Sequence, residues 1–527
     1  MKAKKLITAM SSIFMAGLAL TTAGCGGGGS TAGDINTLEI FCVDAGYGVE
    51  WVDDMVALFK QQAWVQEKYP ELVVTVSSND DQTFAQSRLD AGAKANSLDL
   101  LFGMNMWGYA GEGSNALDLT EVVYNQKVPG EDVLYKDKLD ASYLASNTYV
   151  KTGSNQAYYT ASWVGGMASI LYNEDLYQAN GYTVPNTTDE LIQVCADYKA
   201  KGHYSFIQSF DAPNYFDYLF YVWWGQYEGI EGYNNFFNGI DNDTYSSRIF
   251  NQKGREYALE VFEALLDYDK GYLNPKSTTQ KFVIAQTSFI EGEALMHLNG
   301  DWFSSEMADI MALKGANAPK IKTMRVPIVS KLGEKLGITD AELSAAVDYV
   351  DALGEGETPQ MPAFHSTKSY SAEKIIATVK EARSVVYSIG ASHQAIIPNY
   401  ALAKDIAVDF IRFMATDIAL ESYTKATCGS NLPFNYEVPK AVYDTLPLAQ
   451  QSRIDYFANK NGVYTLIAPQ YFPLVRYGGL TPFVDEQYYT TFSVSGNTKT
   501  AADFMKETKD AWTEQKFSNA LGSAGLK

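Results

Sequence analysis

The stretch LEIFCVDAGYGVEWVDDMVALF, residues 38–59, contains three structural signals in direct succession. Its first six residues, 38–43, are mostly apolar and include branched and aromatic side chains, which predicts a buried strand. A polar loop with two glycines follows at 44–48. Apolar side chains then recur at helical spacing, at Val52, Met55, Val56 and Phe59. The stretch therefore predicts a strand followed by a helix, which is the repeating unit of α/β folds.

The same alternation continues toward the middle of the chain. Strands are predicted at 72–76 and 99–102, with a helix at 84–98 between them. A second block begins near Trp163 and contains an apolar strand at 168–172. Strands that alternate with helices form a parallel sheet with helices on its faces, so the fold class is α/β.

Helices are also expected in the second half of the sequence. Thr187 and Glu190 have the spacing of a capping box and start a helix that Gly202 ends. Further helices are predicted at 253–269, 404–415 and 417–427. The stretch from about 315 to 380 is more polar and irregular, and we interpret it as a surface insertion.

Length and composition limit the possible functions. The 527 residues are too many for one compact core, so at least two lobes are expected. The 62 acidic and 41 basic residues give a net charge of −21, which argues against binding to nucleic acid or to a lipid surface by charge. The chain is also rich in aromatic residues, with 36 tyrosines and 8 tryptophans. Such side chains are common in recognition surfaces, although many of them must pack in the core.

The N-terminus has the pattern of an export signal. Three lysines near the start precede an apolar run at 6–20, which is short for a membrane span. Thr22-Ala23-Gly24-Cys25 then resembles the lipobox of bacterial lipoproteins, so we predict a signal peptide at 1–24 and lipidation of Cys25. An ordinary secretory signal is the alternative. The glycine-rich segment 25–36 would be a flexible tether that holds the protein at the outer face of the cytoplasmic membrane.

Motifs for metal, disulfide or nucleotide chemistry are not visible in the sequence. Cys42, Cys195 and Cys428 are far apart and form no Cys-x-x-Cys pair, which makes a disulfide framework improbable. The four histidines lack the paired spacing of zinc ligands. No phosphate-binding loop of the Gly-x-x-x-x-Gly-Lys type occurs. We therefore expect no metal and no cofactor.

Three stretches, in this order, resemble family 1 extracellular solute-binding proteins, the maltose-binding-like receptors of ABC importers. They are LYNEDLYQANGYTVPNTTDELIQVCADYKAKG (171–202), FIEGEALMHLNGDW (289–302) and AIIPNYALAKDIAVDFIRFMATDIALESYTKATCGSNLPFN (395–435). The resemblance implies a type II periplasmic-binding-protein-like fold with two hinge-linked α/β lobes, each discontinuous in sequence. It also implies a ligand between the lobes, most often a sugar.

The resemblance suggests how the sequence divides between the lobes. We expect residues 37–155 and about 285–400 in the N-terminal lobe, with the insertion at about 315–380. Residues 156–284 and about 401–527 would then form the C-terminal lobe.

Candidate ligand-binding residues follow the predicted strands of the first sheet. In open parallel sheets, ligands bind beyond the carboxyl ends of the strands. The loops at these positions hold Asp44, Tyr47, Asp80, Asn105 and Trp107. An aromatic ring can stack on the C–H face of a sugar, while carboxylates and amides hydrogen-bond its hydroxyls. Asp80 could equally be an ordinary turn residue.

The remaining candidates are three tryptophan sites and one carboxylate. Asp301 and Trp302 follow Gly300, so one side chain could bind hydroxyls while the other covers a ring face. Alternatively, Asp301 caps a helix and Trp302 packs in the core. Trp163 lies where the chain is expected to cross between lobes. Of the neighbours Trp223 and Trp224, one is expected to face the core and the other the ligand, because they cannot share a face.

These observations predict a binding protein rather than an enzyme. We expect a monomer that captures a carbohydrate, in particular an oligosaccharide, and delivers it to an ABC permease with a separate ATPase. Two alternatives stay open. Paired carboxylates beside aromatics also suit a glycoside hydrolase, and a tethered protein can be a sugar sensor or an adhesin subunit.

Overall fold

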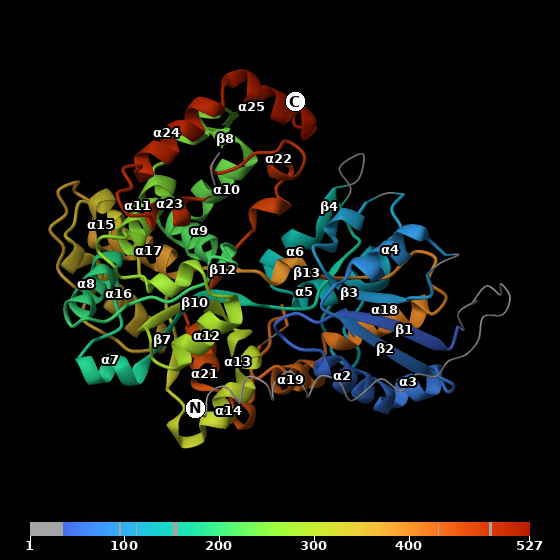
Figure 1. Cartoon of the computed structure of the whole chain (residues 1–527). Helices are drawn as coiled ribbons and strands as arrows, with labels where there is room; N and C mark the ends of the chain where they lie inside the picture. Colours follow the sequence, from blue (N-terminus) through green and yellow to red (C-terminus); the bar gives the residue numbers. More distant parts are fainter. Residues whose placement is uncertain (1–34, 94–95, 112, 151–155, 431, 484–486) are drawn as a thin grey trace. The chain divides into compact units, whose positions relative to one another are not determined.

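The computed structural model describes residues 35–93, 96–111, 113–150, 156–430, 432–483 and 487–527 (Figure 1). The predicted signal peptide, Cys25 and all but the last two residues of the predicted tether lie outside the described residues. None of the described helices has the length and apolar character needed to cross a membrane.

The first sheet has five strands in the order β2-β1-β3-β13-β6. They are β1 (Thr37–Val43), β2 (Val73–Asn79), β3 (Leu100–Met104), β6 (Ala161–Ser162) and β13 (His393–Ile396). β1 pairs in parallel with β2 and β3, as the strand–helix alternation predicts, and β13 is antiparallel to β3 and β6. Because β1 lies between β2 and β3, right-handed crossovers place the two connecting helices, α2 (Glu50–Gln61) and α4 (Thr83–Ala91), on opposite faces (Figure 1).

Further helices complete this part of the molecule. They are α3 (Ala63–Lys68), α5 (Tyr135–Lys138), α6 (Ala141–Asn147), α18 (Lys404–Met414) and α19 (Asp417–Ala426). α18 and α19 pack on α2, where the rings of Phe410 and Phe413 lie 5.2 and 5.5 Å from that of Phe59. Burial of these aromatic side chains is a main source of stability for the layer.

The second sheet is mixed and has the strand order β10-β7-β12-β14, with β11 also paired to β7. Its strands are β7 (Met167–Asn173), β10 (Met296–Gly300), β11 (Ile321–Met324), β12 (Val385–Ser388) and β14 (Tyr464–Leu466). All seven residues of β7 are buried, as expected for the central strand of a sheet that is covered on both faces. Two short hairpins are separate, β4 (Thr148–Val150) with β5 (Gln156–Tyr158) and β8 (Ile240–Asp241) with β9 (Thr244–Tyr245).

A large helical layer surrounds the second sheet. Its central helix, α9 (Asn214–Glu228), contacts β7, β10, β12 and β14 on one side and α10, α11 and α17 elsewhere (Figure 1). The other helices are α7 (Glu174–Asn180), α8 (Thr188–Ala200), α10 (Ile230–Asn238), α11 (Gly254–Leu266), α12 (Phe282–Ile290), α13 (Phe303–Glu306), α14 (Ala308–Lys314), α15 (Lys331–Leu336), α16 (Asp340–Glu355), α17 (Ala372–Ser384), α20 (Lys440–Tyr443), α21 (Leu448–Phe457), α22 (Pro473–Arg476), α23 (Tyr488–Phe492), α24 (Ala501–Ala511) and α25 (Glu514–Ser523).

The strand pairing differs from the division expected from the sequence. Residues 285–388, expected in the first lobe, supply β10, β11 and β12 to the second sheet. Conversely, α18 and α19, expected in the second lobe, pack on α2 of the first sheet. The reason is that β10 completes its hydrogen bonds with β7 along its whole length, a non-local pairing that no local sequence pattern specifies.

The polar stretch at 315–380 is a structured part of the second layer rather than an irregular insertion. It contains β11 and three helices, α15, α16 and most of α17. α16 starts at a capping box formed by Thr339 and Glu342 and buries Leu343, Val347 and Val350. Its polar residues are the exposed side of an amphipathic helix, which explains the composition of this stretch.

Two connections between the sheets run side by side. One joins β6 to β7 through Trp163–Gly166, and the other joins β12 to β13 through Ile389–Ser392. The backbone N–H of Ile389 donates to the carbonyl of Gly166 at 3.1 Å. A Cβ atom on Gly390 would lie 2.3 Å from the carbonyl oxygen of Val164, so only glycine allows this close approach.

Candidate ligand-binding site

A buried cluster joins loop residues of the two sheets. Tyr47 follows β1, Asp301 follows β10, and the Tyr47 hydroxyl donates a hydrogen bond to Asp301 Oδ1 at 3.3 Å. The ring of Tyr47 lies edge-on to three others, with centroid distances of 6.4 Å to Trp163, 6.2 Å to Trp302 and 5.6 Å to His393. Four of the residues predicted from the sequence are thus in one place.

Glycines shape the backbone around this cluster. A Cβ atom on Gly166 would lie 2.2 Å from the Tyr47 hydroxyl oxygen and 3.3 Å from Asp301 Oδ1. At Gly300 it would lie 2.0 Å from the ring of Trp302, which folds back over the strand end. Gly300 therefore makes room for the neighbouring indole.

Asp301 is a carboxylate held inside the protein. It is 4% exposed, and burial raises its pKa to about 6, with the nearby Arg453 guanidinium and the Tyr47 hydroxyl acting in the opposite direction. Its own backbone carbonyl accepts hydrogen bonds from Gln450 Nε2 at 2.5 Å and Ser430 Oγ at 3.2 Å. The side chain is thus held on the second sheet by its backbone and faces Tyr47 from the first.

Glu306 is a second carboxyl beside the cluster, and it is partly buried. Burial raises its pKa to about 7, and Gln286 Nε2 donates to Glu306 Oε2 at 2.6 Å. Its other oxygen lies 2.6 Å from where a Cβ atom on Gly46 would be. Gly46 and Tyr47 belong to the same loop, so this loop packs against both the buried Asp301 and the partly buried Glu306.

The indoles of Trp163 and Trp302 are covered by protein. Trp163 is 1% exposed, stacks on Trp51 at 5.2 Å and donates from Nε1 to the carbonyl of Gly103 at 3.2 Å. Trp302 is 3% exposed and donates from Nε1 to the Tyr215 hydroxyl at 2.8 Å. Neither ring is therefore open to a ligand in this arrangement of the side chains.

Four predicted residues lie at more accessible positions near the ends of β1, β2 and β3. Asp44, Asp80 and Asn105 are exposed and Trp107 is half-buried. The pKa of Asp44 is raised mainly by partial burial, and repulsion from Glu50 and Asp80 raises it further. The backbone N–H of Asn105 donates to the carbonyl of Ser392 at 2.6 Å, which connects this loop to the residue before His393.

Trp223 and Trp224 are not near this cluster. Both belong to α9 and are fully buried. Trp223 Nε1 donates to the carbonyl of Pro327 and Trp224 Nε1 to Gln252 Oε1, each at 3.1 Å. One of the two was expected to face the ligand. Because α9 is enclosed by the second sheet and by its helices, opposite faces of this helix are both in the core.

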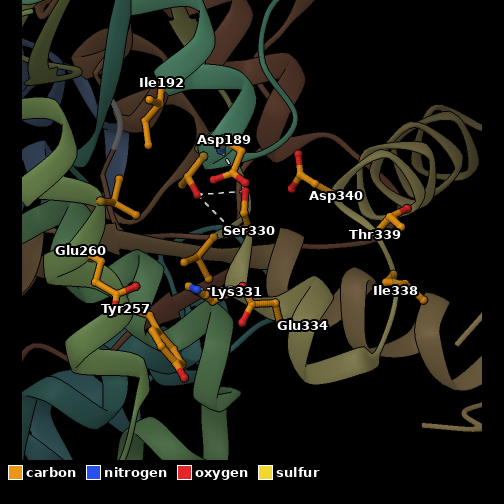
Figure 2. Close-up of a pocket in the computed structure, with 13 residues that line it drawn as sticks. Asp189, Ile192, Tyr257, Glu260, Ser330, Lys331, Glu334, Ile338, Thr339 and Asp340 are labelled. Atoms are coloured by element: carbon orange, nitrogen blue, oxygen red, sulfur yellow. Dashed lines mark hydrogen bonds and ion pairs between the residues drawn. The ribbon is translucent and has the colours of Figure 1, made fainter. Parts of the chain in front are cut away.

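A separate cavity of about 380 Å³ lies among α8, α11, α15 and α16 (Figure 2). None of the predicted residues lines it. Figure 2 shows Lys331 between Tyr257 and Glu334; its ammonium group pairs with Glu334 Oε1 at 2.7 Å and lies 5.6 Å from the Tyr257 ring centroid. On the far side, Ser330 Oγ accepts from the backbone N–H of Asp189 at 2.9 Å. Much of its polar lining is thus already paired.

Several cluster members were not found from the sequence. His393, Arg453, Glu306 and Tyr215 have no motif that marks them. His393 is the first residue of β13, which pairs with β3 only through a long-range contact. Glu306 lies four residues after Trp302 on α13, and that helical spacing was the one available signal.

Comparisons of structure identify the fold. RafE from Streptococcus pneumoniae, in its apo form, aligns with a TM-score of 0.54 and 14% identity over 92% of this chain and 99% of its own. A chitin oligosaccharide binding protein aligns with a TM-score of 0.55 and 16% identity over 92% and 99%. A probable secreted solute-binding lipoprotein from Streptomyces coelicolor aligns with a TM-score of 0.54 and 15% identity over 91% and 99%.

No family model matches the sequence, and no curated protein aligns with it. The structural alignments nevertheless cover at least 91% of this chain and 99% of each of the three proteins. The chain has the two-lobed type II α/β fold of extracellular solute-binding proteins. The first and second sheets are the centres of the two lobes in this fold.

Proposed function

We propose that the chain is a family 1 extracellular solute-binding protein of an ABC importer and that it captures a carbohydrate between its lobes. The observation that carries this proposal is the contact between Tyr47 and Asp301. It brings a loop of the first sheet and a loop of the second sheet together inside a cage of aromatic rings. Ligands of open α/β folds bind beyond strand ends, which is where both loops lie.

The cluster suggests how a sugar would be bound. When Tyr47 moves away from Asp301, the faces of Trp163 and Trp302 become available to the C–H face of a sugar ring. Asp301 loses the Tyr47 hydroxyl and can accept a sugar hydroxyl in its place, in a charge-assisted hydrogen bond. The paired connections at 163–166 and 389–392 would be the hinge about which the lobes separate.

The lobes that move would follow the sheets. One would contain the first sheet with α18 and α19, and the other the second sheet with the segments from 167 to 388 and from about 440 onward. In this proposal Cys25 is lipidated, the protein is a monomer at the outer face of the cytoplasmic membrane, and delivery to a permease is driven by a separate ATPase.

The test is a thermal-shift screen over mono- and oligosaccharides, followed by calorimetry on those that raise the melting temperature. Asp301→Asn should weaken binding of the best sugar at least tenfold, because it removes the charge from one strong hydrogen bond. Asp444→Asn is the control, since this exposed residue pairs with Lys440 on α20. If no sugar stabilises the protein, the proposal fails.

A glycoside hydrolase is the second candidate, and one observation favours it. Asp301 is buried and Glu306 is partly buried, and both carboxyl groups have raised pKa values beside aromatic rings, as an acid catalyst requires. Hydrolysis of an oligosaccharide by the purified chain, abolished in both Asp301→Asn and Glu306→Gln, would identify this enzyme. A binding protein would show affinity for the sugar without turnover.

A further inference from the structure

The guanidinium of Arg476 is held between two aromatic rings. Arg476 is the last residue of α22, and its guanidinium carbon lies 4.2 Å from the ring centroid of Trp107 and 5.2 Å from that of Tyr477. Its Nη2 donates to the backbone carbonyl of Trp107 at 2.6 Å. The rings and this hydrogen bond fix the plane of the guanidinium, so its orientation is set in advance.

This cation has no carboxylate partner among the residues that the structure describes. Its Nε is buried without a hydrogen-bond acceptor. The titratable groups that act on it are the phenols of Tyr477, Tyr471 and Tyr149, and burial lowers the pKa of Arg476. Three other arginines of this acidic chain have carboxylate partners: Arg325 and Arg383 both bond Asp351, and Arg412 bonds Asp409. Arg255 also lies over two rings without a carboxylate among the described residues, but it is fully buried and both of its Nη atoms donate to backbone carbonyls, whereas Arg476 is only partly buried.

Arg476 is connected to the candidate site by a short series of contacts. Trp107 belongs to the 3-10 turn Met106–Tyr109 that follows β3, and the preceding Asn105 is bonded to Ser392. The hydroxyl of Tyr471, just before α22, donates to the carbonyl of Ala391. Ser392 precedes His393, which contacts Tyr47. Arg476 and Trp107 therefore lie at the margin of the Tyr47–Asp301 cluster.

We infer that Arg476 binds an oxyanion substituent of the ligand, so that the captured glycan is acidic. This inference rests on the proposed sugar-binding function. A planar guanidinium matches a carboxylate or a sulfate with two parallel hydrogen bonds, which a neutral hydroxyl cannot form. Trp107 and the half-exposed Tyr477 then offer ring faces to the sugar that carries the anion.

Electrostatic attraction over long distances cannot provide this specificity. The chain carries a net charge of −21, so an anionic ligand is repelled by the protein as a whole. Selection of an acidic sugar must therefore come from a local cation that lacks a carboxylate. Among the described residues, Arg476 supplies this cation beside two rings at the edge of the candidate site.

The test compares acidic probes with neutral probes of the same skeleton by calorimetry. The carboxylate probes are oligogalacturonate and oligomannuronate, each paired with its methyl ester, and the sulfate probe is a sulfated chondroitin disaccharide paired with its unsulfated form. At least one acidic probe should bind about tenfold more tightly than its neutral partner, as expected for hydrogen bonds to a charged group. The pair that shows the difference distinguishes carboxylate from sulfate.

Three variants separate recognition from a structural role. Arg476→Gln should abolish the preference for the acidic probe while leaving the affinity for the neutral partner within about twofold. Arg476→Lys should retain part of the preference, because the charge stays but the planar fork is lost. Lys440→Gln removes the same charge from an exposed side chain on α20 and should leave the preference unchanged.

Two results would overturn the inference. One is a protein that binds neutral oligosaccharides as tightly as every acidic partner. The other is an Arg476→Gln variant that binds acidic and neutral probes more weakly by the same factor. That result is expected if Arg476 only holds the Trp107 loop in place. If no saccharide of either kind binds, the proposed function fails instead, and the two failures are thus distinguishable.

Discussion

The hydroxyl of Tyr47 lies 3.3 Å from Asp301 Oδ1, and these residues belong to loops of different sheets that are 254 positions apart in sequence. Both side chains are buried. A hydrogen bond between such distant segments forms only in the folded protein. Under the proposed function, this contact stabilises the empty protein, and a ligand hydroxyl would replace the Tyr47 hydroxyl at Asp301.

Removal of the Tyr47 hydroxyl tests whether its hydrogen bond to Asp301 stabilises the folded protein. Tyr47→Phe should lower the free energy of unfolding by about 1 kcal/mol, because a buried acceptor loses one donor while the ring packing is kept. Urea denaturation followed by circular dichroism measures the change. Tyr268→Phe is the matched control, because Tyr268 is 56% exposed and should be replaced without effect. Equal stability of the two variants would contradict the role of this hydrogen bond.

The carboxyl groups of Asp301 and Glu306 predict an unusual pH dependence of stability. The pKa values of Asp301 and Glu306, about 6 and about 7, lie above their ordinary values. Between the unfolded and folded pKa values the folded protein binds more protons, so these groups increase stability as the pH falls from about 8 to about 4. Each contributes a change on the order of 2–3 kcal/mol.

The measurement is urea denaturation across this pH range for the parent chain and two variants. Asp301→Asn and Glu306→Gln should each flatten part of the rise at low pH, because the amide does not titrate. Asp444→Asn is the control and should leave the profile unchanged. A profile that is identical in all four proteins would show that neither carboxyl is protonated on folding.

Local sequence patterns were sufficient for the first elements but not for the stretch at 315–380 or for the assembly of the sheets. The apolar runs and the helical spacing within residues 38–102 correctly predict β1, α2, β2 and β3, because each pattern is completed within one element. They do not show that β10, β11 and β12 join β7. That pairing depends on hydrogen bonds between segments more than a hundred residues apart, and residues 285–400 were consequently expected in the other lobe.

The site could be predicted only in part for a similar reason. Tyr47, Trp163, Asp301 and Trp302 were predicted from strand ends and glycine turns, which are visible in one sequence, and the structure places these four side chains together. Trp223 and Trp224 could not be placed, since helical spacing alone does not reveal that both of these α9 positions are buried. Arg476 was missed because a cation becomes notable only when the structure shows no carboxylate beside it among the described residues.

Alanine substitutions at Gly300 and Gly166 test how tightly the Tyr47–Asp301 cluster is packed against the backbone. Gly300→Ala places a Cβ atom 2.0 Å from the Trp302 ring, and Gly166→Ala places one 2.2 Å from the Tyr47 hydroxyl oxygen. Each should cost about 1–3 kcal/mol of unfolding free energy, since buried rings must shift. Gly108→Ala is the control, because no other atom lies within 4 Å of its Cβ position. Wild-type stability of Gly300→Ala would show that Trp302 moves freely.

Trp107 is the accessible ring of the candidate site, and its replacement tests ligand stacking with little risk of unfolding. Trp107→Ala should weaken binding of the best saccharide by about 1–3 kcal/mol, the range known for aromatic stacking on planar bases. Trp302→Ala should do the same but also lower stability, because that ring is buried. Trp223→Phe should lower stability without changing affinity, since its indole contacts only the core around α9. Calorimetry and urea denaturation on the three variants separate these effects. Unchanged affinity in both Trp107→Ala and Trp302→Ala would place the ligand elsewhere in the molecule.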